Sequence, residues 1–139
     1  MRYFVSGHRD LTMKEFEEHY VPQILTILRF DRTPLFLVGD WEGCDEMFFM
    51  FIHAYKVPVV VHYVNKCRID IENIKDKLGD WFEAVVGTEK CNTYDECDAT
   101  MTHNSDFYIA WIRPGREDSH TAKNIKRRYN LWKQIPENQ

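Results

Sequence analysis

The stretch "LFLVGDWEGCDEM", residues 35 to 47, joins an apolar run to an acidic turn that contains two glycines. The run has no polar alternation, which is typical of a strand that is buried on both faces of a sheet. Gly39 and Gly43 allow the chain to leave that strand and enter a helix within a few residues. The first N–H groups of such a helix lack partners and, together with the helix dipole, favour an anion. The stretch therefore predicts a strand, a ligand-binding turn and a helix.

Apolar runs of the same kind predict three further strands, at residues 2–5, 57–64 and 106–112. Between the strands, apolar residues recur at spacings of three and four and predict helices at residues 12–30, 44–56, 70–86, 94–103 and 120–133. Strands without alternation that are separated by helices indicate a parallel sheet covered on both faces. We therefore expect an α/β fold, an open and mainly parallel sheet of about four to five strands sandwiched by helices, of Rossmann type.

Local signals define some of the helix ends. Thr12 and Glu15 have the spacing of a capping box, so the first helix is expected to begin there. Pro22 lies inside that helix and predicts a kink or a break. Gly87 stands where the helix at residues 70–86 would end in a left-handed residue.

The composition fits one domain that spans residues 1–139, because 44% of its 139 residues are hydrophobic and suffice for a core. The longest apolar run is far below the ~20 residues that cross a bilayer, and the chain starts with a strand, so we expect neither membrane insertion nor a signal peptide. A formal charge of -4 argues against general nucleic-acid binding. No motif predicts a metal or a cofactor, and the apolar helices leave room for a homodimer.

The cysteines bear on the compartment. No two of them have a CxxC spacing, which favours reduced thiols in a cytoplasmic protein and leaves a disulfide or a zinc site as alternatives. They are Cys44, Cys67, Cys91 and Cys97.

Ligands of open α/β sheets bind beyond the carboxyl ends of the strands, which directs attention to three loops. In the first, residues 6–10, Ser6 and His8 supply a hydroxyl and an imidazole, and Gly7 lets the backbone approach a ligand. Arg9 suits a phosphate or carboxylate, which it can meet with two parallel hydrogen bonds. The alternative is that Arg9 pairs with an acidic residue and His8 caps a turn.

The second loop, residues 39–45, and the third, residues 113–121, carry acidic and hydroxyl side chains. Asp45 either caps the following helix or, like Asp40, accepts hydrogen bonds from ribose hydroxyls or a base. Trp41 either covers a base or belongs to the wall of the site. The basic run at residues 123–128 is either a solvated helix surface or the source of one or two phosphate contacts.

Taken together, the loops resemble the SLOG superfamily, which includes DNA-processing proteins of the Smf/DprA type, lysine-decarboxylase-like (LOG) phosphoribohydrolases and YspA-like proteins. The resemblance covers roughly residues 2–129 and implies a nucleotide-binding Rossmann variant. The matching residues are Ser6, Gly7 and Arg9, then Gly39, Gly43 and Asp45, then Met101 with Ser105 and Asp106, and finally His120 and Thr121.

The departures from this family concern catalysis. LOG-type enzymes carry Pro-Gly-Gly-x-Gly-Thr-x-x-Glu, whose glutamate acts on the glycosidic bond and whose glycines hold phosphate. Here the run at residues 114–121 places His120 where a glycine stands, and Asn124 replaces the glutamate. The resemblance still implies Ser119, His120 and Thr121 as ligand contacts.

Two functions are compatible with these residues. The first is a non-catalytic module that binds a nucleotide, a nucleoside monophosphate or a nucleotide-derived ligand, and the missing glutamate favours it. The alternative is an N-glycosidic-bond hydrolase or transferase, of the phosphoribohydrolase or deoxyribosyltransferase kind. Such an enzyme needs a carboxylate near the anomeric carbon and an acid at the leaving base. Asp40, Asp45 and Glu117 are the candidates.

Overall fold

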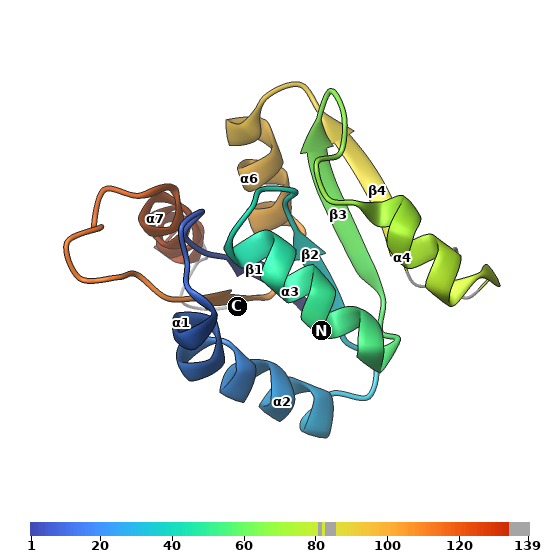
Figure 1. Cartoon of the computed structure of the whole chain (residues 1–139). Helices are drawn as coiled ribbons and strands as arrows, with labels where there is room; N and C mark the ends of the chain where they lie inside the picture. The colour runs from blue at the N-terminus through green and yellow to red at the C-terminus, as the bar shows by residue number, and fades with distance from the viewer. Residues whose placement is uncertain (81, 83–85, 134–139) are drawn as a thin grey trace.

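A single parallel sheet organises the computed structural model, which describes residues 1–80, 82 and 86–133 (Figure 1). The strand order across the sheet is β4-β3-β2-β1-β5, and every neighbouring pair is parallel. The expected α/β fold of Rossmann type is thereby confirmed. The strands are β1 Arg2–Ser6, β2 Leu35–Val38, β3 Val59–Val64, β4 Val86–Cys91 and β5 Phe107–Ala110.

Helices fill most of the connections between the strands. The described helices are α1 Met13–His19, α2 Val21–Phe30, α3 Cys44–Ile52, the short 3₁₀ helix η1 His53–Tyr55, α4 Ile71–Leu78, α6 Tyr94–His103 and α7 His120–Lys133. The helix expected at residues 12–30 is divided at Tyr20, so the predicted break near Pro22 is confirmed. The capping box is confirmed as well, because Thr12 Oγ1 accepts from Glu15 N at 3.2 Å and Glu15 Oε1 accepts from Thr12 N at 3.0 Å. Among the described residues, every helix is too short or too polar to span a bilayer.

The two faces of the sheet bury two separate apolar clusters. In Figure 1, α1 to α4 lie over one face, and α6 with α7 lies behind the other. Alternate residues of β1 divide accordingly, because Tyr3 and Val5 join the larger cluster and Phe4 joins the smaller one with Met101 of α6. The larger cluster also contains Phe48 of α3, which is fully buried. Both faces are therefore covered, which explains why the strands lack polar alternation.

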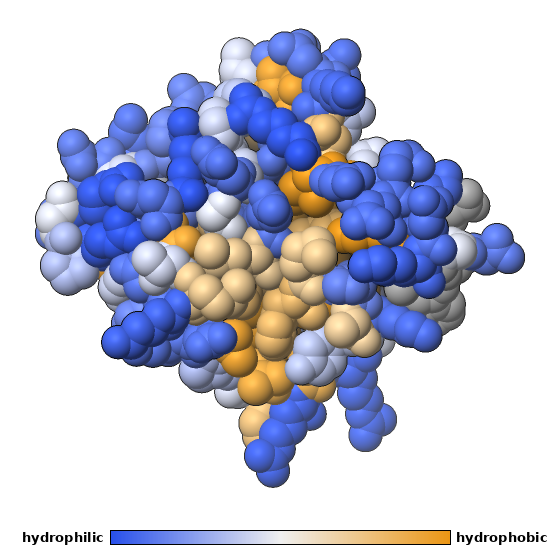
Figure 2. All heavy atoms as spheres, in the orientation of Figure 1, coloured by the Kyte–Doolittle hydropathy of each residue, from blue (hydrophilic) through white to orange (hydrophobic). Residues whose placement is uncertain are grey.

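Apolar side chains remain on the surface above α3. Figure 2 shows them gathered at the centre of the face that α3 occupies in Figure 1. Met50 is 44% exposed and Tyr55 is 46% exposed, and Met47 and Phe51 are partly buried beside them. The helix is thus apolar nearly all round, as its sequence predicted.

The fifth strand, β4, was not among the predicted strands. Within the expected helix at residues 70–86, α4 ends at Leu78 with Gly79 as its C-cap at φ 57. Residues 80 and 82 are again helical, and residues 81 and 83–85 of that prediction lie outside the described residues. The assignment of Gly87 to a helix end was wrong, because Gly87 pairs with Val60 inside β4. As an edge strand with four exposed residues at its centre, β4 has no apolar run to reveal it.

The prediction of four reduced thiols was also wrong for one pair. Cys91, at the end of β4, forms a disulfide with Cys97 of α6, and their Cα atoms lie 5.5 Å apart. Cys44 and Cys67 are free. The tight connection from β4 into α6 brings the two residues to bonding distance, which their separation in sequence did not reveal.

Candidate functional site

A crevice opens at the carboxyl ends of the central strands, where the strand order reverses. The strand β1 has β2 on one side and β5 on the other: the chain runs from β1 through β2 and β3 to β4, and then crosses back to place β5 beyond β1. At this position the structure contains a cavity of about 350 Å³, a volume typical of small-molecule sites. The loops after β1, β2 and β5 line it together with α6 and the start of α7.

Most of the predicted site residues meet in this crevice. Glu117 and Gly43 are not among its lining residues, and the Glu117 carboxylate is exposed and accepts a hydrogen bond from Gly115 N at 3.1 Å. His120, which stands where the family has a glycine, is exposed as well. The predicted residues that line the crevice are Ser6, Gly7, His8, Arg9, Gly39, Asp40, Trp41, Asp45, Ser119, His120 and Thr121.

The start of α3 is occupied by the protein itself. Gly43 has φ +82, and a Cβ on it would overlap the carbonyl oxygen of Arg9. The next N–H group, that of Cys44, donates to His8 O at 3.2 Å. The Asp45 carboxylate lies over Gly39 and accepts from Trp41 N at 3.2 Å. The place where the sequence predicted a ligand anion therefore contains the chain's own carboxyl group.

Three carboxyl groups of the crevice have raised pKa values. Burial raises the pKa of Asp45 to about 8, with the charges of Asp98 and Asp40 acting in the same direction. Burial also raises the pKa of Asp98, on α6, to about 6. Asp40 is 1% exposed, and burial raises its pKa although its Oδ2 accepts from Arg68 N at 2.9 Å. At neutral pH the crevice thus combines a largely protonated acid with a largely ionised one.

Asn124 ties the first turns of α7 to β1. It is 2% exposed, its Nδ2 donates to Ser6 Oγ at 3.1 Å, and its Oδ1 accepts from Arg127 Nη1 at 2.7 Å. Its side chain also interacts with Asp98 and partly offsets the effect of burial on the pKa of that carboxyl. An amide can donate and accept at once, which an ionised glutamate at this position could not do. The carboxyl group beside Asn124 is that of Asp98, which belongs to α6.

The indole of Trp41 has a guanidinium on each face. The Cζ of Arg9 lies 3.4 Å from the ring centroid and the Cζ of Arg68 lies 3.6 Å from it. Two guanidinium groups cannot share one face at these distances, so they cover opposite faces. A base can stack on Trp41 only where it displaces one of the two arginines.

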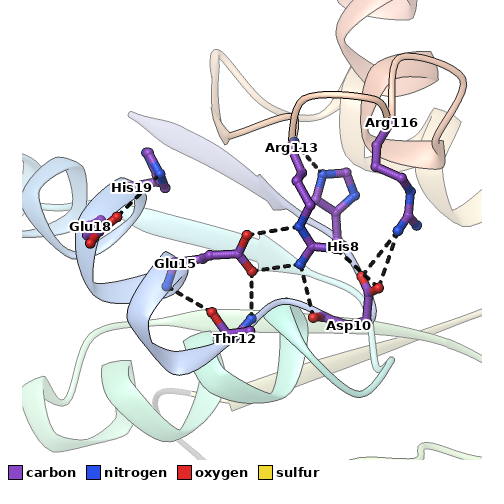
Figure 3. A network of polar contacts seen from close by, with 8 residues as sticks. All are labelled: His8, Asp10, Thr12, Glu15, Glu18, His19, Arg113 and Arg116. Carbon is purple, nitrogen blue, oxygen red and sulfur yellow. Dashed lines mark hydrogen bonds and ion pairs between the residues drawn. The ribbon is translucent and has the colours of Figure 1, made fainter.

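An ion-pair network fastens the loop after β5 to the mouth of the crevice (Figure 3). The Arg113 guanidinium donates to both carboxylate oxygens of Glu15, at 2.9 and 2.6 Å, and to Asp10 Oδ2 at 3.1 Å. Arg116, which lines the crevice, pairs with the same Asp10 at 3.3 Å. These hydrogen bonds hold the pKa of Glu15 at about 2. The loop is therefore fixed to α1 and to the loop after β1.

The basic run at residues 123–128 is divided among several roles. Lys123 lines the crevice, and Arg127 bonds to Asn124. Arg128 is buried and donates to the carbonyl oxygens of Ser105 and Thr102. Only part of the run is thus a solvated helix surface.

The sequence analysis missed the wall that α6 contributes. Because α6 begins just after the carboxyl end of β4, its first turns lie at the level of the crevice. The residues that line the cavity share one helical face, at spacings of three, four and seven, and this pattern is the signal that could have identified them. They are Tyr94, Cys97, Asp98 and Met101.

Within residues 1–80, 82 and 86–133, no three His, Cys, Asp or Glu side chains lie close enough together to hold a metal ion. A comparison with models of known protein families found no match, and a comparison with solved structures found none either.

Proposed function

We propose that this protein binds a nucleotide or a nucleotide-derived ligand in the crevice between β1, β2 and β5, as a binding module. The observation that carries the proposal is the position of the cavity at the strand-order reversal, with cationic donors and carboxyl groups in the same wall. A phosphate requires the cationic donors, and ribose hydroxyls suit the carboxyl groups. The resemblance of the loops to the SLOG superfamily supports the same class of ligand.

The first turn of α7 is the better place for a phosphate in this proposal. Arg116 and Lys123 supply positive charge there, and the helix adds its dipole. Ser119 caps the helix, since its Oγ accepts from Ala122 N at 3.2 Å, and the side chain of Thr121 is buried against the cavity. Asp40 and Asp45 come from the β2–α3 side of the crevice, where they would repel a phosphate but can accept hydrogen bonds from hydroxyls.

One observation favours a second candidate, cleavage of an N-glycosidic bond. Asp45 and Asp98 line the same cavity with pKa values of about 8 and about 6. Two carboxyl groups whose environments hold different protonation states are a common arrangement in glycoside hydrolysis. In this candidate Asp45 protonates the leaving base, and ionised Asp98 stabilises the developing positive charge on the sugar.

A thermal-shift screen tests the proposal. Nucleoside mono- and diphosphates, deoxynucleotides, dinucleotides and sugar phosphates are each added to the purified protein. A ligand at ~100 times its Kd adds about 2.7 kcal/mol to the free energy of unfolding, which is readily detected. A flat response to every compound would contradict the proposal.

Chromatography of the positive mixtures then separates the two candidates. A binding module leaves the nucleotide intact, whereas a glycosidase releases free base. If base is released, Asp98→Asn is expected to abolish turnover while the thermal shift persists. Asp76→Asn is the matched control, because Asp76 is exposed on α4, away from the crevice lining.

Two further properties accompany this proposal. A homodimer would cover the apolar surface of α3 around Met50 (Figure 2), and sedimentation analysis measures it directly. A cytoplasmic location is proposed as well, and the Cys91–Cys97 disulfide is the one observation that speaks against it. Cell fractionation, with alkylation of thiols before lysis, tests both the location and the state of that pair.

A further inference from the structure

We propose that the stack of Arg9, Trp41 and Arg68, of which Arg9 and Trp41 line the crevice, binds a second phosphoryl group. The ligand is then a nucleotide with two separated phosphoryl groups rather than a monophosphate. This inference rests on the proposed nucleotide binding and specifies its ligand class.

The two guanidinium groups are held in place by the indole rather than by a direct ion pair. Both arginines are exposed, and within the described residues neither side chain makes an ion pair or a hydrogen bond of ordinary length. Against the effect of burial, which raises both pKa values, the charge of Arg68 lowers the pKa of Asp40 and that of Arg9 lowers the pKa of Asp45, so the nearest carboxyl groups act on the stack only at longer range. The indole between them fixes their positions at 3.4 and 3.6 Å from its centroid. Like charges separated only by the thickness of a ring repel each other, and an anion that bridges them relieves this repulsion.

The surroundings of the stack make it rigid. The N–H of Arg68 donates to buried Asp40 at 2.9 Å, so the backbone that carries this guanidinium is fixed. The ring of Tyr94 lies 4.8 Å from that of Trp41, and Arg68 Cζ lies 5.0 Å from the Tyr94 ring. Because each guanidinium has several unused donors in a fixed fork, the stack is prepared for the bidentate hydrogen bonds that phosphate oxygens accept.

The strand order separates the Arg68 side of this stack from the start of α7. Arg68 follows β3 and Arg116 follows β5, with β2 and β1 between them, and Arg9 follows β1. From β3 to β5 the sheet spans three strand spacings, roughly 14 Å. One phosphate cannot bridge that distance.

Carboxyl groups line the cavity that both basic regions adjoin. Asp40 belongs to the loop after β2, Asp45 to the first turn of α3 and Asp98 to α6. They favour a hydroxyl-bearing sugar between the phosphoryl groups and disfavour a phosphate at the same point. A nucleoside 3′,5′-bisphosphate has this distribution of charge, whereas a 5′-diphosphate carries both phosphates at one end.

Isothermal titration calorimetry with adenosine and guanosine 5′-monophosphates, 5′-diphosphates and 3′,5′-bisphosphates tests the inference. The bisphosphate of the preferred base is expected to bind about tenfold or more tightly than the monophosphate, since hydrogen bonds to charged groups contribute at least this factor. The 5′-diphosphate is expected to gain less than threefold. Equal affinities for monophosphate and bisphosphate would overturn the inference and leave the proposed function standing, whereas no binding of any nucleotide would overturn both.

Arg68→Gln links the effect to the stack. The substitution keeps the backbone bond to Asp40 and removes one guanidinium, so the advantage of the bisphosphate over the monophosphate is expected to fall to less than threefold. Arg29→Gln is the matched control, because Arg29 is an exposed arginine over another aromatic ring, Phe30, at 5.4 Å. If Arg68→Gln retained the full advantage, or weakened both ligands equally, the stack would be structural and the inference would be wrong.

Discussion

The backbone N–H of Arg113 donates a hydrogen bond to Nε2 of His8, with the two atoms 2.8 Å apart (Figure 3). The bond joins the loop after β5 to the end of β1, across the crevice mouth. Since Nε2 accepts, the proton of the neutral ring is on Nδ1. Burial, followed by the charges of Arg116 and Arg113, lowers the pKa of His8. The fold therefore requires this histidine to be neutral.

The first prediction is that His8 makes the protein less stable in mild acid. A group whose pKa is lowered by folding stabilises the fold above its unfolded pKa, about 6.5, and that stabilisation is lost as the pH falls below it. His8→Gln keeps an acceptor near the position of Nε2 without titrating. Its free energy of unfolding, from urea titrations between pH 5 and 7.5, is expected to depend less on pH, by up to about 1.4 kcal/mol per unit. His103→Gln is the control at an exposed histidine, and parallel pH profiles for wild type and His8→Gln would contradict the prediction.

The second prediction concerns Tyr20, which is fully buried below the crevice. Its hydroxyl donates to Ser6 O at 2.7 Å and accepts from Trp111 N at 3.1 Å, so it joins the carboxyl ends of β1 and β5. Tyr20→Phe leaves two buried backbone groups without partners and is expected to lower the free energy of unfolding by about 2–4 kcal/mol. The measurement is a urea midpoint. Tyr55→Phe, at a residue that is 46% exposed, should cost less than about 0.5 kcal/mol, and similar costs for both variants would refute this role.

Most of the sheet could be predicted because buried parallel strands consist of runs of apolar residues. The four runs that were identified became β1, β2, β3 and β5. β4 could not be found in this way, since four of its six residues are exposed and polar residues occupy most of these positions. It is joined to the sheet by the ladder with β3, from Val59–Val86 to Val64–Cys91. The sequence of β4 does not indicate its pairing with β3.

The site was predictable to the extent that topology determines it. Parallel strands bring their following loops to one edge, which is why residues of three distant loops line one cavity. No comparable rule predicts which side chains pair with each other when they are far apart in the sequence. Arg113 and Glu15 are 98 positions apart, and nothing in the local sequence of either residue indicates the other. The helical pattern assigned Tyr20 to the apolar face. The two hydrogen bonds of its hydroxyl group could not be predicted, for the same reason.

The third prediction separates a steric clash from backbone strain at two glycines. Gly43 and Gly115 both have positive φ, +82 and +88, but a Cβ on Gly43 would overlap Arg9 O, whereas a Cβ on Gly115 meets nothing within 4 Å. Gly115→Ala is therefore expected to cost about 1–2 kcal/mol, and Gly43→Ala about 3 kcal/mol or more. Chemical denaturation of both variants gives the comparison. Equal costs would mean that the approach of α3 to the loop after β1 is not as close as the structure has it.

The fourth prediction is that Asp45 has the opposite pH dependence to His8. Burial raises its pKa from 3.8 to about 8, so the folded state binds a proton that the unfolded state releases. The stability from this group is complete below about pH 4 and is lost as the pH rises towards 8. Asp45→Asn resembles the protonated acid and can still accept from Trp41 N, so its stability relative to wild type is expected to grow between pH 4 and 8, by at most about 1.4 kcal/mol per unit. Urea titrations across this range measure the difference, and Asp76→Asn, at an exposed carboxylate, should leave the profile parallel to wild type. If Asp45→Asn were less stable than wild type at pH 8, the native group would be an ionised carboxylate, and Asp45 could not act as the acid of the crevice.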